Sequence, residues 1–308
     1  MWTQFISLIK GTFEEWREDN AARLAAALAY YTTFSLAPLL VLVIAIAGLL
    51  GGREAAQSHV MGQISSLVGV QGGEFVKSML QTASHPATGV AASLISAATL
   101  LFGALGAFGE LQNSLNTIWD VRPKPAKNFL QGVQRYVVKR ILSFTIVIGI
   151  GFLLLVTLVV SAGLAAIGHY LDGLSLFRDF WLQLINFVIS FLVVTILFMM
   201  IFKVLPEVHI AWKDVLLGAA VTSLLFNIGK FLIGLYLGRS SMMNTFGTAG
   251  SLALLLIWIY YSAQILFLGA EFTQVYAKQF RRDIQPESGM EVIPEHLARN
   301  SQPAVVQQ

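Results

Sequence analysis

The stretch from Thr248 to Tyr276, TAGSLALLLIWIYYSAQILFLGAEFTQVY, limits what this chain can fold into more than any other segment does. About 20 apolar residues at 1.5 Å each cross the roughly 30 Å hydrocarbon core of a bilayer, so the stretch predicts a membrane-spanning helix. Its polar side chains share one face at helical spacing, namely Tyr260, Gln264, Glu271 and Gln274. Amides and carboxylates are costly in hydrocarbon, so this face must turn toward protein or water. It therefore either packs helices together or lines a path for a solute.

The composition of the whole chain is that of a membrane protein. Of its 308 residues, 56% are hydrophobic and only 12% are charged, whereas a soluble domain has about 25% charged residues. There is no cysteine, which excludes disulfides, thiolate catalysis and cysteine metal sites. The five histidines lie in separate segments without ligand spacing, so we expect neither a metal nor a cofactor. A net charge of +3 gives no argument for nucleic acid as a partner.

Apolar periodicity predicts an all-α, polytopic membrane fold with six transmembrane helices. The spans are expected at residues 21–50, 90–119, 141–167, 181–202, 215–237 and 249–276, within a domain from residue 21 to 283. An amphipathic helix with aromatic residues on its apolar side is expected at residues 1–20, lying in the membrane interface. Residues 51–89 indicate one or two short helices outside the membrane. The polar, proline-broken segment 284–308 predicts a disordered cytoplasmic tail.

Lysine and arginine counts determine the expected orientation. The six-span layout puts fifteen of these residues on the side of the two termini and four on the other side, with Lys230 inside a span. Because cytoplasmic loops carry the excess of positive charge, both termini are expected in the cytoplasm. The first span then begins on that side, with Asn20 as its expected N-cap.

Three other spans carry a row of small and polar residues along one face. In the first span the row is Arg23, Ala26, Tyr30, Thr33 and Ala37. In the second it is Ser96, Thr99, Gly103, Gly106, Glu110, Asn113 and Thr117, and in the fifth it is Ala219, Ser223, Asn227, Lys230 and Gly234. Small residues let helix backbones approach closely, which accounts for the glycines but not for Glu110. We expect these rows to face inward, while the uniformly apolar third and fourth spans face lipid.

Three charged residues are expected at one depth near the cytoplasmic boundary, namely Arg23, Glu110 and Glu271. If they meet, they form a charge cluster at the inner mouth, with a carboxylate in salt-bridge range of Arg23. The alternative is that each side chain extends separately to the lipid headgroups. The glutamates are shorter than arginine and have less reach.

Lys230 is the most exceptional single residue because it lies inside a span, roughly 10 Å below the outer end at 1.5 Å per residue. Either it extends to the outer headgroups, or it is a cation in a wet cavity, hydrogen-bonded to Tyr260 or Gln264 and available to an anionic solute. The residues hypothesised to line a solute pathway are Tyr30, Glu110, Asn113, Asn227, Lys230, Tyr260, Gln264 and Glu271.

Four blocks of the sequence resemble one known family. They are AAALAYYTTFSLAPLL (Ala25–Leu40), FGALGAFGELQNSLNTIWDVRP (Phe102–Pro123), the block from Leu205 to Ala219, and GTAGSLALLLIWIYYSAQILFLGAEFT (Gly247–Thr273). The chain is similar in these blocks to the YihY/BrkB family of bacterial inner-membrane proteins, once labelled ribonuclease BN. The resemblance implies a six-helix inner-membrane protein with cytoplasmic termini, suspected of transport or export without a settled substrate. It supplies no catalytic residues.

The old nuclease label fails a chemical test. Ribonuclease chemistry needs clustered carboxylates with a metal, or a histidine acid–base pair, within reach of a long polyanion, and the soluble loops hold no such cluster. We therefore expect no enzyme, and as partners the bilayer and a small solute, with a homo-oligomer left open. The chain is either a secondary transporter or exporter, with a path lined by the first, second, fifth and sixth spans, or a scaffold for envelope integrity or partner assembly. An ATP-binding loop of the GxxxxGK[ST] type does not occur, so any transport is secondary, facilitated or driven by a separate subunit.

Overall fold

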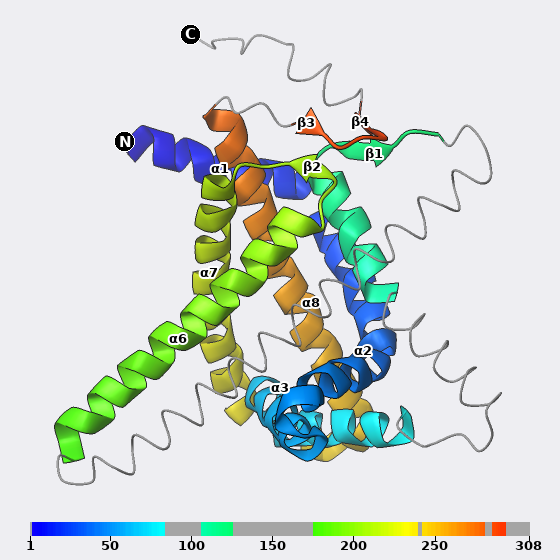
Figure 1. Ribbon diagram of the computed structural model, residues 1–308, viewed down its shortest axis with the longest axis vertical. Coiled ribbons are helices and arrows are strands. Elements are labelled where there is room, and N and C mark those ends of the chain that lie inside the picture. Colours follow the sequence, from blue (N-terminus) through cyan, green and yellow to red (C-terminus); the bar gives the residue numbers. More distant parts are fainter. Residues whose placement is uncertain (1, 84–105, 126–174, 240–241, 281–284, 294–308) are drawn as a thin grey trace.

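The computed structural model describes residues 2–83, 106–125, 175–239, 242–280 and 285–293, which form long helices and two pairs of very short strands (Figure 1). The helices are α1 (Trp2–Glu18), α2 (Ala21–Gly51), α3 (Arg53–Ala83), α6 (Ser175–Val204), α7 (Trp212–Arg239) and α8 (Met242–Gln279). Residues 106–118 are also helical. The strands are β1 (Val121–Pro123), β2 (Val208–His209), β3 (Gln285–Pro286) and β4 (Met290–Val292).

Four stretches of the described helices are long and apolar enough to cross a membrane, namely Ala21–Leu49, Phe187–Val204, Trp212–Leu232 and Gly250–Gln279. They coincide with four of the six spans expected from the sequence. Of the second expected span, only residues 106–119 belong to the described part of the chain, and the third, at 141–167, lies wholly outside it. The predicted N-terminal helix corresponds to α1, and the helices expected within residues 51–89 correspond to α3, which changes direction at Gly69 with a φ of 79°.

The long helices run between two ends of the molecule (Figure 1). α7, α8, residues 106–118 and the first part of α2 lie along the long axis, whereas α1 crosses one end, and the last part of α2 and α3 cross the other. All four strands lie at the end with α1. α6 packs against α7 and leans away from the other described helices toward its own N-terminus. The segments that the sequence predicts on the cytoplasmic side therefore share one end, which we call the α1 end.

Two residues with left-handed backbone conformation end helices at the α1 end. Asn20, with φ 53° and ψ 43°, joins α1 to α2, and Asp120, with φ 57°, ends the helix of residues 106–118 and leads into β1. Asparagine and aspartate are the non-glycine residues that adopt this conformation most readily. Asn20 occupies the predicted N-cap position of α2, but its side chain makes no capping bond and instead donates from Nδ2 to the Glu18 carbonyl at 3.2 Å.

α7 and α8 form an antiparallel pair in which glycine and threonine meet twice. A Cβ placed on Gly218 would lie 1.8 Å from Oγ1 of Thr273, and one placed on Gly269 would lie 1.9 Å from Oγ1 of Thr222. Each threonine hydroxyl donates to its own helix, from Thr222 to the Gly218 carbonyl at 2.7 Å and from Thr273 to the Gly269 carbonyl at 2.6 Å. Small residues at such a crossing let two backbones approach closely within a membrane.

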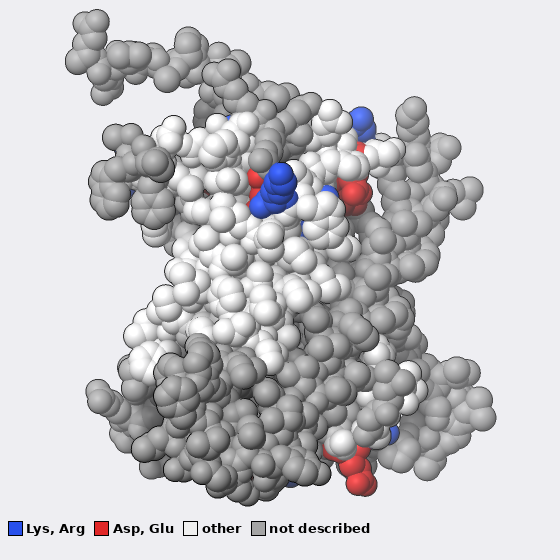
Figure 2. Space-filling view, turned by 60° about the vertical axis from the view of Figure 1, so that its left-hand side comes forward, with Lys and Arg blue, Asp and Glu red and all other residues white. Residues whose placement is uncertain are grey.

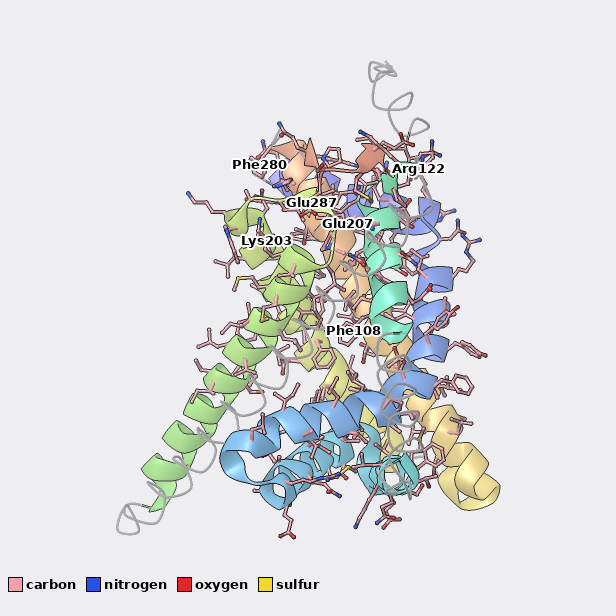
Figure 3. The ribbon with its side chains drawn as sticks, turned by 45° about the vertical axis from the view of Figure 1, so that its right-hand side comes forward. Phe108, Arg122, Lys203, Glu207, Phe280 and Glu287 are labelled. Atoms are coloured by element: carbon pink, nitrogen blue, oxygen red, sulfur yellow. The ribbon has the colours of Figure 1, made fainter. Side chains whose placement is uncertain are left out.

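The segment after α8 pairs with two loops from earlier in the chain. β4 is antiparallel to β1, with Val292 opposite Val121, and β3 is antiparallel to β2. The backbone N–H of Glu287 also donates to the Glu207 carbonyl at 2.9 Å, and the two glutamates lie close together in Figure 3. The sequence predicts disorder from residue 284, and for residues 285–293 that prediction is wrong because backbone pairing orders them. Residues 294–308 lie outside the described part.

Polar side chains fasten the same loops to each other. Asn116 donates from Nδ2 to Oε2 of Glu207 at 2.8 Å and accepts at Oδ1 from the Glu207 backbone N–H at 3.0 Å. Across the strands, Arg122 Nε lies 2.9 Å from Glu291 Oε1, with both side chains partly exposed. The paired loops and tail thus build a polar cap over the α1 end of the bundle.

Candidate functional site

The polar face of α8 leads into the protein toward the α1 end. Glu271 and Gln274 are 0% and 1% exposed, Gln264 is half-buried, and Tyr260 is 38% exposed. α7 contacts α8 at Gly269 and Thr273, which lie on the opposite side of the helix at 100° per residue. The polar face therefore turns away from α7. Its buried end meets α1 and the turn that follows residues 106–118.

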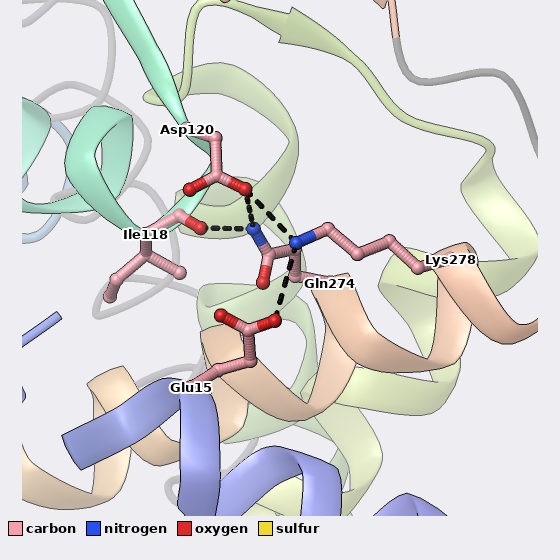
Figure 4. Close-up of polar contacts among 5 residues, drawn as sticks. All are labelled: Glu15, Ile118, Asp120, Gln274 and Lys278. Carbon is pink, nitrogen blue, oxygen red and sulfur yellow. Dashed lines mark hydrogen bonds and ion pairs between the residues drawn. The ribbon is translucent and has the colours of Figure 1, made fainter. Parts of the chain in front are cut away.

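A chain of polar contacts surrounds Lys278 at that end (Figure 4). Gln274 donates from Nε2 to the Ile118 carbonyl and, at 3.0 Å, to Oδ2 of Asp120. The ammonium of Lys278 lies 3.0 Å from the same Asp120 oxygen and 3.6 Å from Oε1 of Glu15. Lysine thus joins α8 to α1 and to the turn after residues 106–118.

Four carboxylates gather around this single ammonium, and we call Glu15, Asp19, Asp120 and Glu271 the acidic cluster. The charges that act on Glu271 come from Asp19, Glu15, Lys278 and Asp120, with Asp19 the strongest. Asp19 lies in the turn between α1 and α2 and is 8% exposed. Burial first, and the carboxylates of Asp120 and Glu15 next, raise the pKa of Asp19 to about 7.

Several buried oxygens of this site have no hydrogen-bond partner among the described residues. They include both carboxylate oxygens of Glu271, Oδ2 of Asp19, and Oε1 of Gln264 and Gln274. Leaving such a group unpaired away from water costs about 1–3 kcal/mol for a neutral group and more for a charge. An additional hydrogen-bond donor beside these oxygens would therefore stabilise the bundle.

A groove of about 500 Å³ opens beside the cluster, between α1 and α8. Its walls are Ser7, Gly11, Glu14, Glu15, Glu18, Val275, Lys278 and Gln279. Glu15 and Lys278 belong both to the groove and to the polar contacts of Figure 4, so the groove connects the cluster with the surface at the α1 end.

α1 presents three different sides around its axis. Leu8 and Thr12 are buried against the protein, and Gly11 lies so close to α8 that a Cβ would be 3.2 Å from Val275. A second side carries the exposed apolar residues Ile6, Ile9 and Phe13. The third carries Lys10, Glu14 and Arg17, with Lys10 and Glu14 3.7 Å apart. A helix that contacts protein, hydrocarbon and water at once has this distribution.

Among the residues coloured as described in Figure 2, the charged side chains lie toward the two ends of the face. The described surface between those ends shows no charged residue in this view. An uncharged belt between charged ends is the surface that a bilayer requires of a protein that crosses it.

Sequence comparison places this architecture in a family. The family model described as virulence factor BrkB matches residues 12–291. The chain belongs to the BrkB family. Among curated proteins, this BrkB-family chain is similar to UPF0761 membrane proteins, and no solved structure matches it.

Three of these relatives show how the chain compares in length. The protein of Ralstonia nicotianae is 27% identical over 82% of this chain and 55% of its own length. That of Psychrobacter is 24% identical over 88% of this chain and 48% of its own length, and that of Tolumonas auensis is 27% identical over 84% of this chain and 82% of its own. The BrkB-family chain thus spans about half the length of the first two relatives.

The inner-mouth charge cluster expected from the sequence does not form as predicted. Arg23 is exposed, and none of the ion pairs among the described residues joins it to Glu110 or Glu271. Glu110 is half-buried on a different side of its helix from Asp120. The cation beside the buried carboxylates is Lys278, because the last turn of α8 brings it against α1, whereas the first turn of α2 points Arg23 outward.

The rows expected to face inward on the first and second spans do so only in part. In α2, Thr33 and Ala37 are buried as predicted, but Ala26 and Tyr30 are exposed, and the first turns of the helix bury Ala21, Ala25, Leu28 and Ala29 instead. In residues 106–118, Asn113 is exposed, and the hydroxyl of Thr117 donates to the Asn113 carbonyl of its own helix at 3.1 Å. Both helices carry small residues on more than one side, so periodicity alone did not identify the packed face.

The buried polar row of the second span is Gln112, Asn116 and Asp120, which sequence reasoning missed. Gln112 donates a hydrogen bond to the Leu205 carbonyl at 3.1 Å, and Asn116 donates one to the Glu207 carboxylate. The Asp120 carboxylate accepts hydrogen bonds from Gln274 and Lys278. The three residues are four positions apart, so their common face was readable from the sequence. The longer row that contains Glu110 and Asn113 was interpreted as the inward face instead, so this face was not predicted.

The remaining predicted pathway residues are not brought together in one cavity by the described residues. Lys230 is half-buried and has no hydrogen bond to Tyr260 or Gln264, and its neighbour Gly229 packs against the ring of Tyr261. Asn227 donates within its own helix to the Ser223 carbonyl at 2.8 Å. Tyr30 is 60% exposed, and its ring centroid lies 4.9 Å from that of Phe34, with the two ring planes tilted by 58°. The cavity hypothesis for Lys230 stays a prediction.

The described residues include no group of three or more His, Asp or Glu side chains placed to hold a metal ion. The four carboxylates of the acidic cluster are thus near enough to influence one another and too dispersed to act as a ligand set. Their common chemistry is the exchange of protons and charge-assisted hydrogen bonds.

Proposed function

We propose that this BrkB-family membrane protein is a secondary transporter or exporter of a small solute. The observation that carries the proposal is the polar face of α8, on which Gln264 and Glu271 hold buried oxygens that have no hydrogen-bond partner in the part of the chain that the structure describes. A membrane interior offers no water to such groups, so a spanning helix usually keeps them only where they meet a solute, an ion or a hydrated path.

The proposed path follows this face from the α1 end inward. Seven residues separate Gln264 from Glu271, so at 1.5 Å per residue the unpartnered oxygens extend over about 10 Å of the helix. α2 and residues 106–120 border the path on the side of the polar face, and α7 supports α8 from behind. α6 is peripheral to it. The solute is an anion if Lys230 on α7 takes part, since its ammonium would then supply the opposite charge.

The direct test is flux through purified protein in liposomes. Vesicles with and without protein are loaded with a pH-sensitive dye and given gradients of acetate, lactate, phosphate, choline or putrescine, so that anionic and cationic solutes are both represented. Wild-type protein is expected to accelerate entry of at least one of these solutes, and Glu271→Gln is expected to reduce that rate at least tenfold while eluting as folded protein. Glu74→Gln, at an exposed position on α3, serves as the control and is expected to behave as wild type.

If the protein is a scaffold that transports no solute, the flux experiment should give a different result. Protein without transport activity would leave the permeability of the vesicles unchanged for all five solutes, and none of them would shift the melting temperature of the purified protein. That combination would contradict the transport proposal and leave envelope integrity or partner assembly as the function to pursue.

A further inference from the structure

We infer that Glu271 and Asp19 share a proton-binding site, reached from the groove between α1 and α8 and bordered by Lys278. The inference rests on the proposed function in one respect only, namely that binding of this proton is coupled to transport. Binding of the proton itself follows from the arrangement of side chains and does not require transport.

The first support is the imbalance of charge in the acidic cluster. Lys278 provides one ammonium, and it is engaged at 3.0 Å by Asp120 and at 3.6 Å by Glu15. Glu271 is fully buried, and neither of its oxygens has a partner among the described residues. Asp19 is also buried, with Oδ2 unpartnered. An isolated buried carboxylate is neutralised rather than left charged.

A proton satisfies both groups at once. A protonated carboxyl is a hydrogen-bond donor as well as an acceptor, whereas two carboxylates can only accept. Asp19 is among the charges that act on Glu271, and both carboxyls hold buried oxygens without a partner among the described residues, so these two are the pair that one proton would serve. When two carboxylates share a site, the proton belongs to the pair rather than to either residue.

The second support is the route to the site. Glu15 and Lys278 line the groove of about 500 Å³ and also contact the cluster, so they connect it with water at the α1 end. Glu15 is a carboxylate that can relay a proton, and the ammonium of Lys278 lies between the groove and Asp120. A proton therefore has a path of ionisable groups from the surface to the buried pair.

The charged surroundings come from every element packed around Glu271. α1 contributes Glu15, the turn to α2 contributes Asp19, the turn before β1 contributes Asp120, and α8 itself contributes Lys278. Glu18 of α1 acts on Asp19 but is not among the charges that act on Glu271. On α7, the residues against this part of α8 are the uncharged Gly218 and Thr222, and Asp214 lies in the first turn of that helix.

The site is also better suited to a proton than to a metal cation. A divalent ion needs several oxygens converging at short distances, and the described residues include no group of three or more His, Asp or Glu side chains that could supply them. A proton needs only two oxygens, or one oxygen and a water molecule.

The test measures the proton directly in purified protein. Infrared difference spectra between acid and alkaline buffer report the carbonyl band of a protonated carboxyl group in wild type, Glu271→Gln, Asp19→Asn and the control Glu74→Gln. Wild type and the control are expected to show a band that titrates, and both site variants are expected to lose it. Because Asp19 lies outside the spanning helices, Asp19→Asn tests the loss of the band even if Glu271→Gln does not fold.

Thermal unfolding gives a second readout with a definite sign. Because the pKa of Asp19 is raised in the folded protein, folding takes up a proton between about pH 4 and pH 7, so stability is highest below that range and falls as the pH rises through 7. The melting temperature of wild type should therefore decline over this window. Asp19→Asn should flatten the decline, and Glu74→Gln should retain it.

Three results would overturn the inference. They are a carboxyl band that survives in both site variants, a wild type without any such band, and a melting temperature that responds to sodium at constant pH instead of to pH. None of these measurements depends on flux. A titrating pair without transport would refute the proposed function alone, and solute flux through wild-type protein that shows no titrating pair would refute the proton site alone.

Discussion

The crossing of α7 and α8 provides the sharpest test of the packing. In Gly218→Ala the new Cβ would lie 1.8 Å from Oγ1 and 2.9 Å from Cβ of Thr273, whereas ordinary contacts begin at 3.4 Å. Relief therefore requires a movement of roughly 1.6 Å, the difference between these distances. Thr273 cannot give way by rotation alone, because it is β-branched, its hydroxyl is bonded to Gly269 at 2.6 Å, and its Cβ is itself too close.

The expected cost follows from overpacking. Inserting a methyl group into a close-packed contact typically costs about 1–3 kcal/mol, and the better helix propensity of alanine returns at most about 1 kcal/mol. We therefore expect Gly218→Ala to lower the free energy of unfolding by about 1–2 kcal/mol. At about 2–4 °C per kcal/mol, the melting temperature of the detergent-purified protein should fall by several degrees.

A matched control and a rescue separate this effect from the general effect of replacing glycine. A Cβ added to Gly62 on α3 would have no atom within 4 Å, so Gly62→Ala should leave the melting temperature unchanged or raise it. The double variant Gly218→Ala with Thr273→Gly should recover part of the lost melting temperature, because removing the threonine side chain from α8 makes room for the new methyl group on α7. If Gly218→Ala melts like Gly62→Ala, the two helices do not approach each other as described.

Three further changes test the cap, the corrected charge cluster and the lysine. Asn116→Ala removes two hydrogen bonds to Glu207 and should cost about 1–3 kcal/mol in thermal unfolding, with an unchanged melting curve as the contrary result. Arg23→Ala should be no more destabilising than Arg17→Ala, since neither side chain is buried, and a clearly lower melting temperature for the former would restore the original cluster. Lys230→Met should keep the fold and abolish flux of an anionic solute, with arginine rescuing only in part, and unchanged flux would assign the lysine to the headgroups.

Long apolar segments made most of the helices predictable. α2, α6, α7 and α8 follow from their length and hydropathy, and the polar face of α8 follows from a few polar residues in an otherwise apolar helix. In such a helix only one face can turn inward. α2 offered two candidates, because alanines occur on both sides of it, and the packed side proved to be that of Ala21 and Ala25 rather than that of Tyr30.

The acidic cluster was beyond sequence reasoning for a different reason. Glu15 and Asp19 belong to the predicted interfacial helix and the turn that follows it, and nothing in their local sequence shows that α8 covers them. The strands are equally hidden, since two or three residues show no periodicity and their pairing partners lie far apart in the chain. Local pattern predicts which segments are helical, while contacts between distant segments decide which side chains are buried together.

The pairing of the tail has a consequence for how the protein is made. β1 and β2 leave the ribosome long before β3 and β4, so both loops must wait for the last helix before their backbone groups are paired. The tail can reach them only if α8 has been inserted in the direction that leaves its end beside α1. A chain with α8 inverted would carry β4 on the far side of the bilayer and leave the backbone groups of β1 and β2 without these partners. Closure of the cap therefore requires the correct orientation of the last helix.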